Sequence, residues 1–114
     1  MKPVVVVGPK ESQIVATLAA TVTRATYFPQ ADEVVENLLF NTENRGAVVA
    51  AFGLGAEEVI RMRRALGGKA SEMIYGSTVR DELTAVQTGA SGSRTILLPA
   101  DGQDLMDLIQ QAIR

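Results

Sequence analysis

Apolar residues occur in this chain as short continuous runs separated by longer segments with helical periodicity. The runs cover 4–7, 25–28, 47–52, 72–75 and 95–98, and β-branched or small aliphatic residues are frequent in them. Short apolar runs bounded by Gly, Pro or polar residues are typical of strands that are buried on both faces. The pattern therefore predicts five strands.

Between the runs, apolar residues recur every three or four positions, which is the spacing of one face of an α-helix. The five predicted helices begin after Pro9, at about Asp32, at about Ala56, at Thr78 and at Asp101. We expect the third helix to end at Leu66, because two glycines follow it. Thr78, with Asp81 three residues later, resembles a capping box for the fourth helix.

Strict alternation of strands and helices predicts a parallel sheet with helices on both faces. With 114 residues, the chain has the length of one ordinary domain. We expect a single domain over residues 1–114, with an α/β (βα)5 flavodoxin-like, receiver-like fold of three layers and a five-stranded parallel sheet.

Composition narrows the function classes. The chain has no Cys and no His, and its net charge is -2. The absence of these residues excludes disulfides, thiolate metal sites, a cysteine nucleophile and the commonest general base. We therefore expect no enzyme activity, no metal and no cofactor. The charge gives no general attraction to nucleic acid or to membranes, and the apolar runs are far shorter than the ~20 residues of a membrane span. A soluble cytoplasmic protein is the expectation.

The C-terminal part of the chain resembles a known family. A small-residue turn with Gly89 and Ala90 follows the fourth helix, a strand ends in Leu98-Pro99, and an amphipathic helix closes the chain. This order resembles the end of the receiver domains of response regulators in two-component signal transduction. The segment 61–68 also resembles the third helix of that family and the loop after it.

The resemblance implies a phosphorylation pocket that is degenerate here. Receivers carry two acids after the first strand, a phosphoacceptor Asp at the end of the third, a Ser or Thr after the fourth, and a Lys before the final Pro. The matching positions hold Gly8-Pro9-Lys10, Ala51 or Phe52, Ser77 or Thr78, and Leu98 before Pro99. Only the Ser or Thr is retained.

The chemistry of the missing groups gives the same prediction. Mg²⁺ requires clustered carboxylate oxygens, and phosphoryl transfer requires neutralisation of charge around the reacting oxygens. We therefore expect a pseudo-receiver that is not phosphorylated and that serves as a protein-interaction, signalling or localisation module. The resemblance implies that its partner, or a second copy in a homodimer, contacts the face of the fourth helix, fifth strand and fifth helix. The candidate interface residues are Tyr75, Arg94, Thr95 and Leu105.

Two alternatives belong to other classes. Gly53 and Gly55 precede the third helix, and with Gly8 and Ser77 they could bind a small anion or nucleotide through free backbone amides at the strand ends. Glycines also permit tight turns without any ligand, and we favour that explanation. The other alternative is a structural subunit of a larger assembly.

Charged side chains add little to these hypotheses. Lys10 follows the first strand and could place its ammonium in the vacated acidic pocket, although we favour an ordinary solvated lysine. Arg61, Arg63 and Arg64 have no aromatic neighbours that would indicate nucleic-acid binding. We expect the acidic residues of the last helix to stabilise its N-terminus and not to bind metal.

Overall fold

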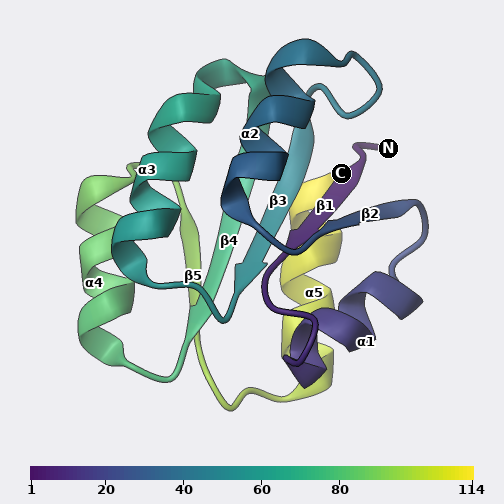
Figure 1. Cartoon of the computed structure of the whole chain (residues 1–114). Helices are drawn as coiled ribbons and strands as arrows, with labels where there is room; N and C mark the ends of the chain where they lie inside the picture. The colour runs from purple at the N-terminus through teal and green to yellow at the C-terminus, as the bar shows by residue number, and fades with distance from the viewer.

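The computed structural model describes all residues, 1–114, and its five strands form one parallel sheet in the order β2-β1-β3-β4-β5 (Figure 1). The strands are β1 (Val4–Val7), β2 (Ala25–Phe28), β3 (Ala47–Phe52), β4 (Ala70–Ser77) and β5 (Arg94–Leu97). The chain thus has the predicted α/β (βα)5 flavodoxin-like fold.

Five helices cover the two faces of this sheet. They are α1 (Gln13–Thr21), α2 (Ala31–Phe40), α3 (Ala56–Leu66), α4 (Arg80–Gly89) and α5 (Gly102–Ile113), with a short 3-10 turn at Gly67–Lys69. Helices α2, α3 and α4 lie on one face, and α1 and α5 lie on the other (Figure 1). The result is the three-layer sandwich that the alternation predicts.

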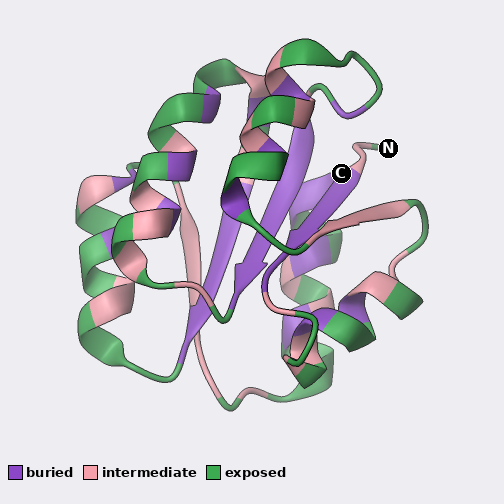
Figure 2. Ribbon diagram, in the orientation of Figure 1, coloured by how far each residue is buried: buried purple, intermediate pink, exposed green.

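The sheet divides the core into two clusters, and the valine run of β1 contributes to both. Val5 and Val7 pack under α2, α3 and α4, whereas Val4 and Val6 pack under α1 and α5. Successive side chains of a strand point to opposite faces, so a strand between two helical layers is apolar at every position. All residues of β1 and β3 are buried, and those of the edge strands β2 and β5 are only half-buried (Figure 2).

Side-chain caps and a glycine fix several helix ends. The Ser12 hydroxyl accepts a hydrogen bond from the Val15 amide at the start of α1, and the Asp101 carboxylate accepts one from the Gln103 amide at 2.7 Å at the start of α5. These contacts satisfy amides that have no partner inside the helix. Helix α3 ends at Leu66, as predicted, and Gly67, whose φ is 52°, follows as its C-terminal cap.

The predicted capping box at the fourth helix is wrong. Helix α4 begins two residues after Thr78, and its N-terminal cap is Val79, whose side chain accepts no hydrogen bond. Instead, the Ser77 hydroxyl accepts a hydrogen bond from the Val79 amide at 3.0 Å. This hydrogen bond links the loop between β4 and α4 to the last residue of β4. It also directs the Ser77 side chain toward α4.

The topology places the loops after the strands along one edge of the sheet. The order of the strands reverses between β1 and β3, and ligands of open parallel sheets bind beside such a reversal, beyond the carboxyl ends of the strands. None of the helices combines the length and the apolar character needed to cross a membrane.

Candidate functional site at the strand ends

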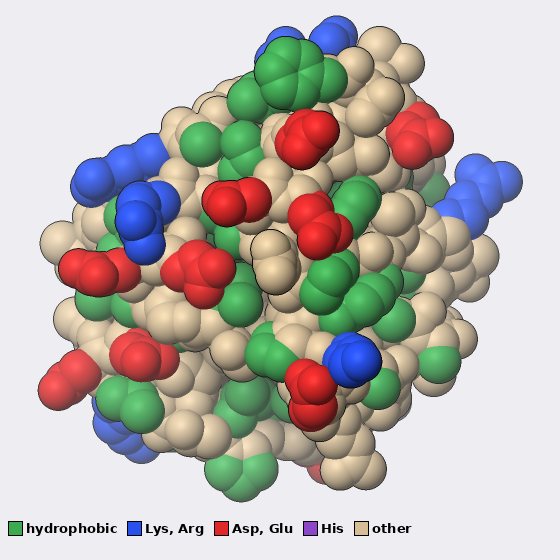
Figure 3. Space-filling view, in the orientation of Figure 1, with side chains coloured by type: hydrophobic (Ala, Val, Ile, Leu, Met, Phe, Trp, Pro, Cys, Tyr) green, Lys and Arg blue, Asp and Glu red, His purple; other side chains and the backbone are tan.

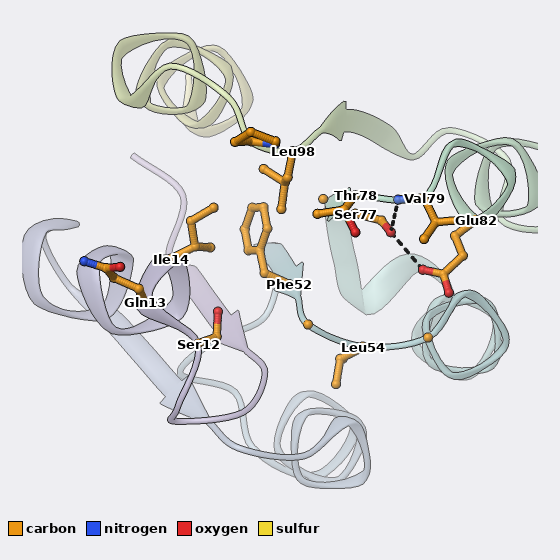
Figure 4. Close-up of a pocket in the computed structure, with 14 residues that line it drawn as sticks. Ser12, Gln13, Ile14, Phe52, Leu54, Ser77, Thr78, Val79, Glu82 and Leu98 are labelled. Carbon is orange, nitrogen blue, oxygen red and sulfur yellow. Dashed lines mark hydrogen bonds between the residues drawn. The ribbon is translucent and has the colours of Figure 1, made fainter.

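A pocket of about 670 Å³ lies at the carboxyl ends of β3, β4 and β5, beside the start of α1 (Figure 4). The residues that line it are Ser12, Gln13, Ile14, Phe52, Gly53, Leu54, Gly55, Gly76, Ser77, Thr78, Val79, Glu82, Leu98 and Pro99. Four separate strand-to-helix connections therefore meet at this pocket. We call it the strand-end pocket.

One half of the strand-end pocket is hydrocarbon. The Phe52 side chain is fully buried at the end of β3, and in Figure 4 it lies between Ile14 and Leu98. A Cβ atom built on Gly76 would lie 2.5 Å from Phe52 Cδ1 and 3.3 Å from Leu98 Cδ1. Only glycine at position 76 leaves space for the phenyl ring, so Phe52 and Leu98 pack together at this end of the sheet.

Backbone geometry at the end of β1 excludes a side chain altogether. A Cβ atom on Gly8 would overlap the carbonyl oxygen of Phe52 and would lie 2.8 Å from Val15 Cγ2. Because the neighbouring strand cannot move away without breaking the sheet, no acid can stand at position 8. Pro9 is half-buried and Lys10 is exposed, and neither lines the strand-end pocket.

The other half of the pocket is polar and is centred on Glu82, in the first turn of α4. Glu82 Oε2 accepts a hydrogen bond from the Ser77 hydroxyl at 2.8 Å and lies 2.9 Å from the Tyr75 hydroxyl. The Tyr75 hydroxyl also lies 2.8 Å from the carbonyl oxygen of Leu54. Its single proton can be donated to either acceptor. These contacts join β4, α4 and the loop after β3.

Burial and a hydrogen bond hold Tyr75 in its protonated form. The side chain is fully buried. Burial, as the larger cause, and the hydrogen bond to Glu82 together raise its pKa from the ordinary 10.0 to about 12. Removal of the proton would leave a phenolate beside a carboxylate in a poorly solvated place. Tyr75 is therefore a hydrogen-bond donor at any ordinary pH.

The structure gathers most, but not all, of the predicted pocket residues. Phe52, Ser77, Leu98 and Pro99 line the strand-end pocket together with the two predicted ligand-binding glycines, Gly53 and Gly55. Ala51 is buried on the other face of the sheet, in the cluster under α2, α3 and α4. Of the two residues that the resemblance offers for the phosphoacceptor position, Phe52 lines the pocket and Ala51 does not.

The predicted interface needs correction at two residues. Tyr75 is fully buried and Leu105 is 6% exposed, because β4 is covered by helices on both faces and Leu105 lies on the core side of α5. Arg94 and Thr95 are half-buried at the edge strand β5. Arg94 forms an ion pair of 3.0 Å with Glu72, and Thr95 Oγ1 accepts a hydrogen bond from the Gln87 side chain.

Glu82 is the only charged residue that lines the pocket. No group of three or more acidic residues is placed to hold a metal ion. Gly55, at the N-terminal cap of α3, forms no side-chain cap, but Glu57 and Glu58 in the first turn offset the positive helix end. The predicted use of Gly53 and Gly55 as an anion site therefore finds no cation to support it.

The basic side chains lie outside the pocket, and two of them donate hydrogen bonds to backbone carbonyl oxygens. Arg63 donates to the carbonyl oxygen of Gly67 at 2.9 Å, and Arg64 donates to that of Gly89 at 3.3 Å. The face that carries α2 and α3 shows acidic side chains among hydrophobic ones, with most of the basic groups toward its margins (Figure 3). This face therefore offers no continuous basic surface for nucleic acid.

Sequence reasoning missed Glu82. It lies seven residues after Tyr75 and five after Ser77, but in α4 and not in β4, so no single helical or strand periodicity relates the three residues. The turn at 78–79 brings the three side chains together. An acidic residue near the start of a helix, after a strand that ends in Ser, was the available signal.

Searches with this chain against protein-family models, curated proteins and solved structures return no match. Its own fold and its own pocket are therefore the basis for a functional assignment.

Proposed function

We propose that this chain is a receiver-like signalling or localisation module that works through protein–protein contact and not through aspartyl phosphorylation. Its strand order and helix placement are those of a flavodoxin-like sandwich. The strand-end pocket has lost the acids and the lysine that the resemblance to receivers implies.

One observation carries the proposal. The buried ring of Phe52 packs against Gly76 and Leu98 at the place where phosphoryl transfer would occur. A hydrocarbon surface neither coordinates Mg²⁺ nor neutralises a developing phosphoryl charge. Gly8 contributes a second obstacle, because no side chain fits at its position.

The proposed contact surface is the edge of β5 with the adjoining faces of α4 and α5. All four residues of β5 are half-buried, and an edge strand offers unpaired backbone groups to another chain. Thr95, which is half-buried, is the proposed central contact of this surface, and Arg94 is its neighbour in the strand. A homodimer across β5 is the first form of the proposal to test.

The chemical part is tested by incubation of the protein with acetyl phosphate and Mg²⁺, followed by intact-mass spectrometry. We expect no added phosphate. A phosphorylated fraction that disappears after hydroxylamine treatment would indicate an acyl phosphate and would contradict the proposal.

The contact part is tested by sedimentation velocity over a range of protein concentrations. We expect association that Thr95→Arg weakens. Phe40→Ser is the matched control, because Phe40 is 79% exposed on α2, which packs over β1 and β2. Association that is weakened by Phe40→Ser and not by Thr95→Arg would place the contact elsewhere. A chain that stays monomeric would exclude the homodimer.

A further inference from the structure

The charge that faces the strand-end pocket has one sign. Glu82 is its only charged lining residue, and acidic residues occupy the first turns of both α3 and α4. These carboxylates offset the positive ends of the helices that point toward the pocket. A ligand with negative charge would therefore meet repulsion there, and a ligand with positive charge would not.

The Glu82 carboxylate is already oriented. Two donors, Tyr75 and Ser77, meet its Oε2 atom, and their side chains are 0% and 9% exposed. Figure 4 shows the Ser77 and Glu82 side chains directed toward each other from β4 and α4. The Oε1 atom takes part in neither contact and remains able to accept another hydrogen bond. An acceptor fixed in this way loses little conformational freedom when a ligand binds.

Beside this carboxylate lies an apolar surface formed by Phe52, Leu98 and Val79. Val79 is 48% exposed, although it is a large hydrophobic residue, and a ligand in the pocket would cover it. The volume of about 670 Å³ falls within the range of about 300–1,000 Å³ that is usual for small-molecule sites. One carboxylate without further acids suits an organic cation better than a metal ion.

We infer that the strand-end pocket binds a small organic cation, a protonated amine on a flat apolar body. The ammonium group donates to Glu82 Oε1, and the apolar body covers Phe52, Leu98 and Val79. This ligand has the opposite charge to the anion or nucleotide that the glycines at the strand ends could bind. The inference does not depend on whether the chain contacts a protein partner or on which face it uses.

The test uses benzylamine and benzoate, two probes of nearly equal size and opposite charge, in amide NMR titrations at pH 7. We expect benzylamine to shift the amide signals of Gly53, Gly76 and Val79 in a saturable way, and benzoate to leave them in place. Equal shifts with benzoate, or no saturable shift with benzylamine, would overturn the inference. This arm requires no variant.

A second arm assigns the effect to one carboxylate. Glu82→Gln keeps an oxygen that can accept from Tyr75 and Ser77 but removes the charge. We expect it to weaken benzylamine binding by about tenfold, since a hydrogen bond to a charged group contributes roughly that much. Glu36→Gln, at an exposed position of α2 beyond its first turn and outside the pocket lining, should leave the affinity unchanged. Equal affinity in the wild type and Glu82→Gln would also overturn the inference.

Discussion

The two halves of the strand-end pocket differ in what they can do. Around β3 and the loop after β5, the surface is hydrocarbon, formed by Phe52 and Leu98, and the buried Gly8 behind it has no space for a side chain. Around β4 and α4, three polar side chains form hydrogen bonds with one another, namely Tyr75, Ser77 and Glu82. The first half excludes the chemistry of a receiver, and the second retains an ordered acceptor.

This difference teaches that strand ends without acids or a lysine need not form a disordered or empty rim. The apolar half is stabilised by close packing, which no longer tolerates the side chains that the resemblance implies. The polar half is stabilised by buried hydrogen bonds that lock α4 against β4. Substitutions in the two halves should therefore reduce the stability of the fold by different amounts and for different reasons. Four predictions test that contrast.

The largest effect is expected at Gly8. Gly8→Ala places a methyl group against the Phe52 carbonyl oxygen and 2.8 Å from Val15 Cγ2, so the backbone of two adjacent strands must shift. We expect a loss of about 3 kcal/mol or more in the free energy of unfolding, measured by urea denaturation. Gly55→Ala is the control, because no atom lies within 4 Å of its added Cβ. Equal losses in both variants would mean that β1 and β3 are not packed as described.

Gly76→Ala should have the next largest effect. The new methyl group would lie 2.5 Å from Phe52 Cδ1, but a side chain can rotate where a backbone cannot. We expect a loss of about 1–3 kcal/mol and displacement of the phenyl ring into the strand-end pocket, seen as changed ring-current shifts at Leu98 and Ile14. A variant with wild-type stability and unchanged shifts would refute the tight packing of the apolar half.

Tyr75→Phe tests the polar half. It removes one buried hydroxyl and should cost about 1 kcal/mol at pH 7. Burial first, and then the hydrogen bond to Glu82, raises the pKa of Tyr75 from 10.0 to about 12. The folded state therefore keeps this proton between about pH 10 and pH 12 while the unfolded state loses it, and stability falls as pH rises through that window.

The pH dependence is measured as the difference in unfolding free energy between the wild type and Tyr75→Phe, which cancels other groups that titrate there. The advantage of the wild type should be complete below pH 10 and should shrink toward pH 12. A constant difference across this window would mean that Tyr75 is not held protonated by its surroundings.

The smallest effect is expected at Arg94, outside both halves. Its ion pair with Glu72 is 3.0 Å long, but the two side chains are 37% and 24% exposed. Partly solvated pairs contribute little, so Arg94→Ala should cost about 0.5 kcal/mol, and less at high salt. A loss as large as that of Gly76→Ala would show that the β5 edge is more strongly coupled to the core than its exposure indicates.

Sequence patterning predicted the fold well because burial on both faces of a parallel sheet leaves a strong signal. The observed elements match two of these signals: β1 coincides with the valine run, and α3 coincides with the segment of helical periodicity that two glycines follow. Strand β4 is longer than predicted, since its ends contain Ala70, Ser71, Gly76 and Ser77, which have small or polar side chains. The pattern could not distinguish such residues from a turn.

The site was harder to predict because its contacts join distant backbone segments. The missing receiver groups could be identified by position, but the overlap that bars a side chain at Gly8 depends on the carbonyl oxygen of Phe52. Glu82 approaches Tyr75 only because α4 starts after Val79 and not at Thr78. Tyr75 was assigned to an interface only because the resemblance to receivers implies one there, whereas its hydroxyl forms hydrogen bonds within the chain, with Leu54 and Glu82.

The most direct test of the central claim is an amide NMR titration with Mg²⁺ and beryllofluoride, which mimics a phosphoryl group on a receiver aspartate. Because Phe52 and Leu98 leave no group there that binds Mg²⁺ or a phosphoryl mimic, we expect the amide signals of Gly8, Phe52 and Ser77 to stay in place. This should hold when Mg²⁺ and beryllofluoride are both present at saturating concentrations. Saturable shifts at these three residues that require Mg²⁺ and beryllofluoride together would contradict the account, because they would show a working phosphoryl site at the strand ends.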